Sequence, residues 1–235
     1  MKPTRWLDKA NVAIEGIIYS VKTQRHMRYH LAAALGVLLL SLVVNISRTE
    51  FILLSLAIIL VLVAEMLNTA IEVAVDMISE EYHPKAKIAK DIAAGVVLVA
   101  SIGALILAYL ILYPAIREAI ATGFWRMRKV PNDVIAFVSF AVVVIVVVII
   151  KAVLGTGEPL RGGMPSGHAA VSFSLWVATI YLSGSPPVIA VTFMLAAMVS
   201  WRRWSSGVHK PREVFAGAFL GAGLTLLLFL LFSQE

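Results

Sequence analysis

Long apolar segments follow one another along almost the whole chain, and they constrain the fold more than any other feature. Of the 235 residues, 60% are hydrophobic and only 14% are charged, which is more apolar surface than a soluble domain can bury. Inside a bilayer each spanning segment must satisfy its own backbone hydrogen bonds, so even the valine-rich segments are predicted to be helices. We therefore predict an all-α integral membrane protein with seven crossings, at residues 31–45, 51–78, 84–113, 133–150, 168–182, 188–200 and 213–232.

Two further segments are expected to lie at the membrane surface. Residues 4–29 combine helically spaced apolar positions with Lys9, Glu15 and Lys22, which predicts an interfacial amphipathic helix, although a plain membrane anchor would read similarly. Residues 114–132 mix aromatic and basic side chains and are predicted to be an interfacial linker. The expected domains are then residues 1–113 and 133–235. No cleavable signal peptide is expected, and the absence of cysteine excludes disulfides and thiolate metal sites.

A first polar cluster lies in the second half of the 51–78 segment. Glu65, Asn68, Glu72 and Asp76 fall on one face of a helix because of their spacing. Several carboxylates at membrane depth suggest metal binding or proton transfer. A polar seam that only joins helices is the alternative, but single asparagines usually serve that purpose.

These residues resemble the small integral-membrane diacylglycerol kinases and undecaprenol kinases of bacteria. The motifs are Glu65-x-x-Asn68-Thr-Ala-x-Glu72-x-x-x-Asp76, then Glu81-Tyr-His and Ala-Lys90-Asp91. The resemblance covers about residues 4–113 and implies a homotrimer that uses ATP and Mg²⁺ at the cytoplasmic face. It implies the following roles: Glu65 as general base, Asn68 as its positioning partner, Glu72 with Asp76 as metal ligands, and Lys90 with Asp91 as nucleotide contacts.

The chain departs from this family at a second metal ligand. The family has a glutamate four residues before an arginine on the surface helix; with Arg28 as that arginine, the position is Gln24, and a neighbouring family asparagine is His26. A neutral amide is a poorer ligand for a hard divalent cation than a carboxylate. The kinase-like half is therefore expected to be the weaker catalyst.

A second polar cluster spans residues 161–213. Pro165-Ser166-Gly167-His168 opens a helix, and its free N–H groups together with Arg161 suit an anion. Further on, Arg203-x5-His209-x3-Glu213 supplies a second cation, a second histidine and a carboxylate one helical turn later, which can hold one imidazole nitrogen and leave the other free. The alternative is that these histidines simply lie at the interface beside basic loops.

This cluster resembles the type 2 phosphatidic acid phosphatase superfamily over about residues 133–232. Its Pro-Ser-Gly-His signature is intact, whereas the third signature carries an inserted Arg202 and has Glu213 in place of aspartate. The first signature is weakest, because Lys151 lies ten residues before Arg161 and Gly162 replaces proline. The resemblance implies catalysis without a metal cofactor: His209 as nucleophile, Glu213 as its orienting carboxylate and His168 as general acid. Phosphate would be bound by Arg161, Arg203, Ser166, Gly167 and Lys151.

Counting crossings from a cytoplasmic surface helix puts both clusters on the cytoplasmic face of the bacterial inner (plasma) membrane. Fifteen of the twenty Lys and Arg residues then lie inside, as the positive-inside tendency expects. Residues 114–132 are the exception with four on the outer side, and a dip or an added crossing there would turn the second cluster outward. The net charge of +6 suits anionic lipid and phosphate-bearing substrates; no nucleic-acid partner is expected.

The sequence therefore predicts a bifunctional enzyme of lipid phosphates. The first hypothesis is a phosphatase acting on phosphatidic acid or an undecaprenyl phosphate or diphosphate through a phosphohistidine, joined to a kinase-like domain. The second is an ATP- and Mg²⁺-dependent lipid kinase whose C-terminal half regulates it or hydrolyses its product. The third is a lipid-binding scaffold in which both sites are inactive.

Overall fold

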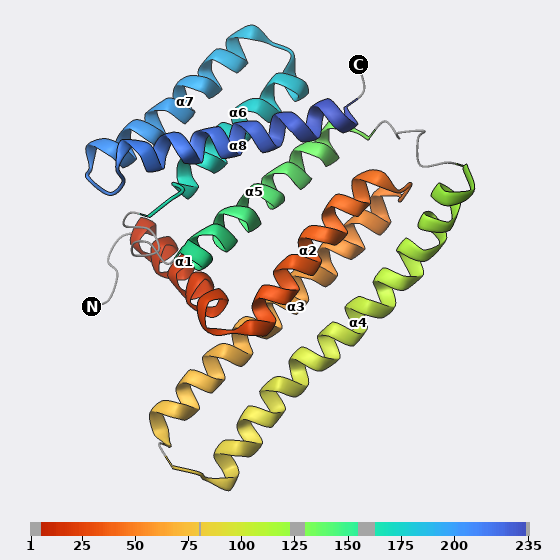
Figure 1. The fold of residues 1–235 in the computed structure, drawn as a ribbon, viewed down its shortest axis with the longest axis vertical. Coiled ribbons are helices and arrows are strands. Elements are labelled where there is room, and N and C mark those ends of the chain that lie inside the picture. Colours follow the sequence, from red (N-terminus) through yellow and green to blue (C-terminus); the bar gives the residue numbers. More distant parts are fainter. Residues whose placement is uncertain (1–5, 80, 123–129, 155–162, 234–235) are drawn as a thin grey trace. The chain divides into compact units, whose positions relative to one another are not determined.

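The chain folds entirely into helices over the residues that the computed structural model describes, namely 6–79, 81–122, 130–154 and 163–233. Eight helices lie in these ranges (Figure 1): α1 Trp6–Thr23, α2 Arg25–Val43, α3 Arg48–Ile78, α4 Pro84–Thr122, α5 Asn132–Leu154, α6 Gly167–Ser183, α7 Pro186–Ser205 and α8 Pro211–Phe232. The predicted all-α membrane fold is confirmed.

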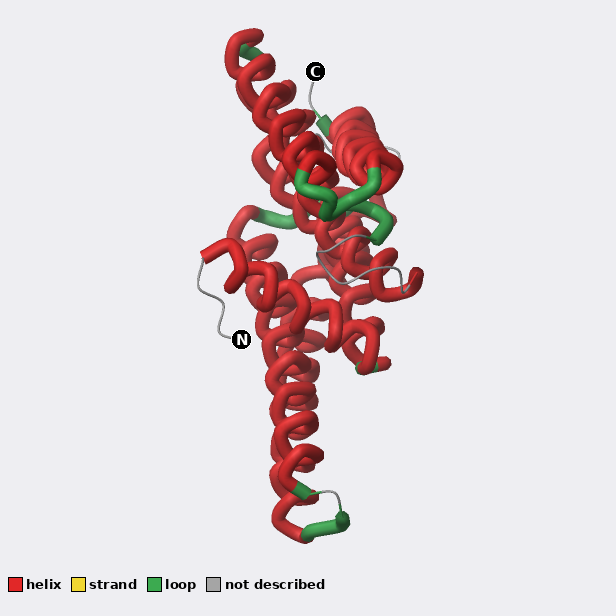
Figure 2. The backbone as a smooth tube through the Cα atoms, turned by 90° about the vertical axis from the view of Figure 1, so that its left-hand side faces the viewer, coloured by secondary structure: helices red, strands yellow, loops and turns green. Residues whose placement is uncertain are grey.

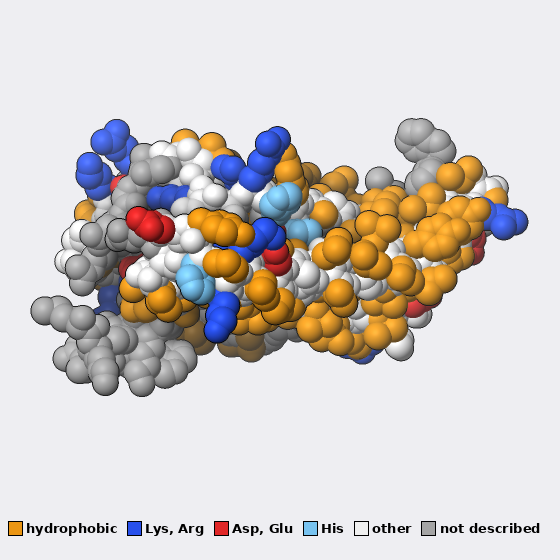
Figure 3. Space-filling view, turned by 90° about the horizontal axis from the view of Figure 1, so that it is seen from below, with side chains coloured by type: hydrophobic (Ala, Val, Ile, Leu, Met, Phe, Trp, Pro, Cys, Tyr) orange, Lys and Arg blue, Asp and Glu red, His pale blue; other side chains and the backbone are white. Residues whose placement is uncertain are grey.

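Five of these helices, α2, α3, α4, α5 and α8, are long and apolar enough to cross a bilayer. The helix α6 has only 17 residues, and α7 carries Arg202 and Arg203 in its last turn. Hydrophobic side chains cover wide stretches of the face shown in Figure 3, as expected of a surface that contacts lipid. A count of seven crossings stays a prediction, because α6 and α7 fall outside these limits of length and composition.

The chain divides into two compact units, residues 23–128 and residues 1–22 together with 129–235. The first unit holds α2, α3 and α4, and the second holds α5 to α8. The helix α1, which the sequence analysis grouped with residues 1–113, falls in the second unit up to Lys22.

In the first unit, α3 and α4 run side by side in opposite directions (Figures 1 and 2), and α2 packs on α3. Ser47 and Glu50 begin α3 with a capping box: the Ser47 hydroxyl accepts from the Glu50 N–H at 3.3 Å, and the Glu50 carboxylate accepts from the Ser47 N–H at 2.6 Å. This cap fixes where α3 starts.

Helix boundaries differ from those expected, most clearly at two places. The predicted surface helix at 4–29 ends at Thr23, because Gln24 adopts an extended conformation with φ −99° and ψ 120° and α2 begins at Arg25. The helix α4 continues past its expected end at Tyr113, through Pro114 to Thr122. A proline within a helix removes one backbone hydrogen bond, and the neighbouring turns can carry the helix through it. The rest of the expected linker, 123–129, lies outside the described residues.

In the second unit, α8 packs against α6 at very short range. A Cβ atom on Gly217 would meet the backbone carbonyl of Ser166, and a Cβ on Gly221 would meet that of Ala170. One turn further along, Ser174 and Thr225 share a buried hydrogen bond of 2.7 Å. Small residues every fourth position on both helices therefore allow backbone-to-backbone contact, as in close helix pairs in membranes.

The far end of this helix bundle is held by contacts to Asn132, the first residue of α5. Its side-chain amide donates to the Tyr181 carbonyl at 3.1 Å, and its side-chain oxygen accepts from the Ser233 hydroxyl at 2.9 Å. The rings of Tyr181 and Phe229 stack nearby with centroids 4.2 Å apart. Contacts at both ends therefore hold α6 against α8 and place the polar start of α6.

Candidate functional sites

The first candidate site lies where α6 and α8 begin. Ser166 precedes the first turn of α6, and its backbone N–H donates to the carbonyl of Glu213 in α8 at 2.9 Å. The Ser166 side chain is fully buried, and its hydroxyl has no hydrogen-bond partner among the described residues. This leaves a buried hydroxyl and the unshared N–H groups of the first turn of α6, both of which suit an anionic ligand.

His209 lies in the turn between α7 and α8, opposite that helix start. Gly207 forms the turn with φ +70°, and the backbone N–H of His209 donates to the carbonyl of Arg203 at 3.1 Å. The imidazole Nδ1 contacts Glu213 Oε2 at 2.9 Å, and the same carboxylate accepts from the Lys210 N–H at 3.1 Å. The carboxylate therefore orients the ring through Nδ1.

The opposite nitrogen of His209, Nε2, is the candidate reactive group of this arrangement. His209 is 3% exposed, and Nε2 is buried without a hydrogen-bond partner in the described part of the chain. Burial lowers the pKa of His209, and the hydrogen bond to Glu213 opposes that shift. A neutral imidazole with one free lone pair is a nucleophile.

The other predicted residues of this cluster converge on the same place. His168, the second residue of α6, contacts the guanidinium of Arg203 from α7, with 2.5 Å between Nε2 and Nη2. Its ring lies within electrostatic reach of His209 and of Lys151 from α5. Lys151 is 5% exposed and in turn lies within electrostatic reach of Arg203 and Glu213. Two imidazoles and two cations from four parts of the chain thus surround one small region.

Part of the predicted site cannot be placed. Arg161 and Gly162 fall in residues 155–162, outside the described residues. Gly163, which follows them, is buried and has φ +86°, a left-handed conformation that favours glycine. The role of Arg161 stays a prediction.

The second candidate site lies in the first unit, on the predicted polar face of α3. Glu65 and Asn68 are buried, at 2% and 8% exposure, and Asn68 Nδ2 donates to Glu72 Oε1 at 3.0 Å. Glu65 Oε1 and Asn68 Oδ1 have no hydrogen-bond partner within the described ranges. The two unpaired oxygens are acceptors that a ligand hydroxyl would satisfy.

Gln24 completes this cluster in an unexpected way. Its side-chain amide donates to Glu72 Oε2 at 2.7 Å, so each oxygen of the Glu72 carboxylate accepts from an amide. No group of three or more His, Asp or Glu side chains able to hold a metal ion is found among the described residues. A divalent cation prefers several oxygen ligands that carry negative charge. In this arrangement both oxygens of Glu72 are occupied by amide donors, so a divalent cation could bind there only if those donors moved away.

The remaining predicted kinase residues form ion pairs at the ends of α3 and α4. Lys90 Nζ lies 2.5 Å from Asp76 Oδ1, and Lys87 Nζ lies 2.5 Å from Asp91 Oδ2. All four side chains are more than one-third exposed. The structure thus brings the predicted metal ligand Asp76 to the predicted nucleotide contact Lys90.

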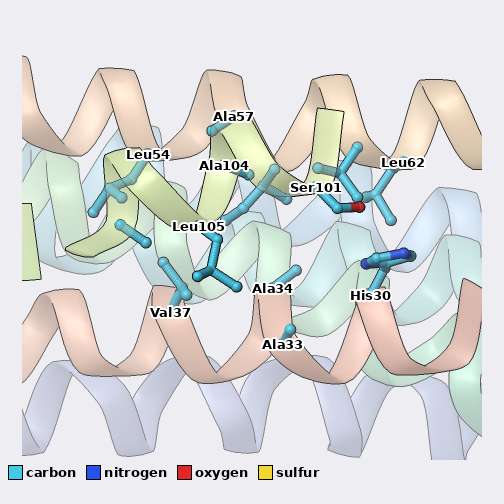
Figure 4. A pocket seen from close by; sticks show the side chains of 13 residues that line it. His30, Ala33, Ala34, Val37, Leu54, Ala57, Leu62, Ser101, Ala104 and Leu105 are labelled. Atoms are coloured by element: carbon cyan, nitrogen blue, oxygen red, sulfur yellow. The ribbon is translucent and has the colours of Figure 1, made fainter. Parts of the chain in front are cut away.

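His30 was missed by the sequence analysis. Its Nε2 lies 3.6 Å from the otherwise unpaired Oε1 of Glu65. His30 also lies at one end of an apolar pocket of about 220 Å³ between α2, α3 and α4, where the hydroxyl of Ser101 is the other polar group (Figure 4). Nothing in the local pattern distinguishes His30 from the basic residues before it, because its partner is 35 positions away in the sequence.

Comparison with known proteins assigns each half to a family. The family model described as prokaryotic diacylglycerol kinase matches residues 11–112, and that of the PAP2 superfamily matches residues 153–235. No solved structure matches the chain. Both resemblances seen in the sequence are therefore confirmed.

The similar curated proteins match the N-terminal half. Undecaprenol kinase from Bacillus subtilis (strain 168) is 41% identical over 99 residues, which are 42% of this chain and 80% of the relative. Diacylglycerol kinase from Synechocystis sp. (strain ATCC 27184 / PCC 6803 / Kazusa) is 39% identical over 100 residues, which are 42% of this chain and 57% of the relative. Diacylglycerol kinase from Escherichia coli (strain K12) is 31% identical over 103 residues, covering 44% and 84%. The chain belongs to the prokaryotic diacylglycerol kinase family through its N-terminal half, to which a PAP2 superfamily domain is fused.

Proposed function

We propose that this protein removes phosphate from a membrane lipid phosphate through a phosphohistidine on His209. The observation that carries the proposal is the geometry of His209, whose Nδ1 is held by Glu213 at 2.9 Å while Nε2 is buried and unpaired. An imidazole fixed in this way has one lone pair directed into the cluster. A general acid, His168, and a cation, Arg203, lie beside it.

The reaction follows in two steps. The phosphoryl group is bound by Arg203, Lys151, Ser166 and the first N–H groups of α6 at Gly167, with Arg161 as a further predicted contact. His209 Nε2 attacks phosphorus, the bond to the lipid oxygen breaks, and His168 gives that oxygen a proton. Glu213 stabilises the positive charge on the His209 ring. Water then attacks the phosphohistidine, its proton passes to His168, and phosphate leaves.

The substrate class is inferred from the membrane setting and from the fused half. The site begins at the end of apolar helices, where a lipid headgroup would lie. The relatives of the N-terminal half are named for undecaprenol and diacylglycerol. Phosphatidic acid and undecaprenyl phosphate or diphosphate, whose dephosphorylation yields these alcohols or undecaprenyl phosphate, are the leading candidates.

We place both sites on the cytoplasmic face of the plasma membrane and expect a homotrimer through the kinase-like half.

The direct test is phosphate release from a panel of these lipid phosphates, with and without EDTA. Release that is unchanged by EDTA supports the proposal. Release that requires a divalent cation, or no release from any member of the panel, would refute it.

A second candidate function is phosphorylation of a lipid alcohol by the N-terminal half. The favouring observation is the buried Glu65, whose Oε1 has no hydrogen-bond partner among the described residues and suits a general base. A stretch of 99 residues of this chain is 41% identical to an undecaprenol kinase. This reaction would use ATP and Mg²⁺, with Asn68, Lys90 and Asp91 at the substrates and Glu72 and Asp76 at the metal. Metal binding at Glu72 requires that the hydrogen bonds from Gln24 and Asn68 to its carboxylate break first. ATP-dependent labelling of diacylglycerol or undecaprenol tests it.

A further inference from the structure

The contact between His168 and Arg203 fixes the proton state of the histidine. The two atoms that meet, His168 Nε2 and Arg203 Nη2, lie 2.5 Å apart. A guanidinium carries only N–H donors and stays charged in proteins. Nε2 must therefore accept this hydrogen bond, which requires a neutral ring whose proton is on Nδ1.

This state conflicts with the role of His168 in the proposed reaction. A general acid must carry the proton that it gives to the leaving oxygen, and a doubly protonated ring has no lone pair for Arg203. Arg203 in turn is needed on the phosphate oxygens. While Arg203 contacts the ring, neither residue is ready for catalysis.

Burial, and after it the surrounding charges, favours the neutral ring as long as no phosphate is bound. The ionisable groups acting on His168 are Arg203 from α7, His209 from the α7–α8 turn and Lys151 from α5, and the guanidinium of Arg203 is permanently charged. Glu213 lies against His209 on the side away from Nε2. A phosphoryl dianion placed among these groups would reverse the local potential and attract the guanidinium, because Arg binds phosphate oxygens more strongly than a neutral imidazole.

We infer that Arg203 acts as a positioning residue that keeps His168 neutral in the empty site and releases its Nε2 for protonation when a phosphoryl group binds. This inference rests on the proposed phosphatase function. One proton then enters from solvent with the substrate and passes to the lipid oxygen in the first step. His168 recovers a proton from water in the second step and loses it to solvent as phosphate leaves and Arg203 returns. His168 is thus protonated in the first step only when a substrate with a bond between phosphorus and the lipid oxygen is bound.

The test is ¹⁵N NMR of the full-length, histidine-labelled protein in lipid bilayers at about pH 6, where an ordinary imidazole is about three-quarters protonated. Sulfate is the probe, because it is a tetrahedral dianion that does not titrate in this range. The His168 signal, assigned by its loss in His168→Gln, should show a neutral ring with the proton on Nδ1 in the empty protein. Saturation with sulfate should convert it to the doubly protonated ring.

An Arg203→Met variant separates the positioning role from simple burial. It keeps much of the side-chain length but removes every donor, so the protonated fraction of His168 without sulfate should rise above that of the native protein. A doubly protonated ring in the empty native protein would overturn the inference. So would a ring that stays neutral with sulfate, or a protonated fraction in Arg203→Met that does not rise above that of the native protein. Phosphate release measured on the same samples reports separately on the proposed function, since an enzyme can be active without this proton coupling.

Discussion

Gln24 donates a hydrogen bond of 2.7 Å to Glu72 across 48 positions of sequence, at the position where the resemblance to the kinases predicts a metal ligand. Asn68 donates to the other oxygen of the same carboxylate. Both oxygens of the Glu72 carboxylate therefore accept hydrogen bonds from amide groups, in place of the cation that the resemblance predicts. Among the described residues, the Glu72 carboxylate is thus satisfied by two amide donors.

Replacing Gln24 by Glu should restore a divalent-cation site. Two carboxylates at this separation repel each other unless a cation lies between them, so Mg²⁺ affinity should rise about tenfold or more. ATP-dependent phosphorylation of diacylglycerol or undecaprenol should increase, and Mg²⁺ should raise the thermal midpoint of the variant more than that of the native protein. Gln24→Ala is the matched control, because it loses the hydrogen bond without adding a charge. Equal kinase turnover in all three proteins would mean that the missing carboxylate is unimportant.

Replacing His209 by Ala should abolish phosphate release, with a loss of at least about 10³-fold, because the nucleophile itself is removed. Glu65→Ala should leave phosphate release unchanged, since Glu65 belongs to the cluster on α3. Phosphate release from the same lipid phosphate measures both variants. Equal losses in both would contradict the existence of two separate sites.

Replacing Glu213 by Gln should shift the acidic limb of kcat/KM to lower pH. Burial lowers the pKa of His209 and the Glu213 hydrogen bond raises it. Without the carboxylate charge, the pKa of His209 should therefore fall further. His209 must be neutral to attack phosphorus, and a lower pKa keeps it neutral at lower pH. The maximal rate should nevertheless fall about 10²-fold or more, because the charge on the ring is no longer stabilised. An acidic limb that moves to higher pH would show that Glu213 does not act on His209 in this way.

Replacing Gly221 by Ala should separate α6 from α8 and destabilise the phosphatase-like half. The added Cβ would meet the backbone of Ala170, which cannot rotate away, and such overpacking costs about 1–3 kcal/mol. Gly223→Ala in the same helix is the control, because nothing lies within 4 Å of its Cβ position. Thermal unfolding in detergent measures both variants. A Gly221→Ala protein as stable as Gly223→Ala would contradict the close packing of these helices.

Much of the candidate phosphatase site could be predicted from the sequence, because its contacts are local or follow from helix ends. Glu213 stands one helical turn after His209, and the structure has the expected contact between them at 2.9 Å. The Pro-Ser-Gly-His stretch was expected to open a helix, and α6 begins at Gly167. The convergence of these segments was inferred from the resemblance to a family, and no spacing argument could supply it.

The contacts that could not be predicted are long-range ones between polar side chains. Gln24 was read as a missing ligand, but its donor contact to Glu72 depends on how α2 packs on α3. The contacts of His30 with Glu65 and of Arg203 with His168 likewise depend on how separate helices pack together. The predicted helix boundaries were wrong at Gln24, whose extended backbone ends α1, and at Pro114, which lies within α4.

The most direct measurement is to quench the reaction with ³²P-labelled lipid phosphate in the presence of EDTA and to locate any covalent label. The account predicts a label that is stable in alkali, labile in acid and attached to His209, and that is absent from His209→Ala. Phosphate release without such a label, or a label that persists in His209→Ala, would contradict it.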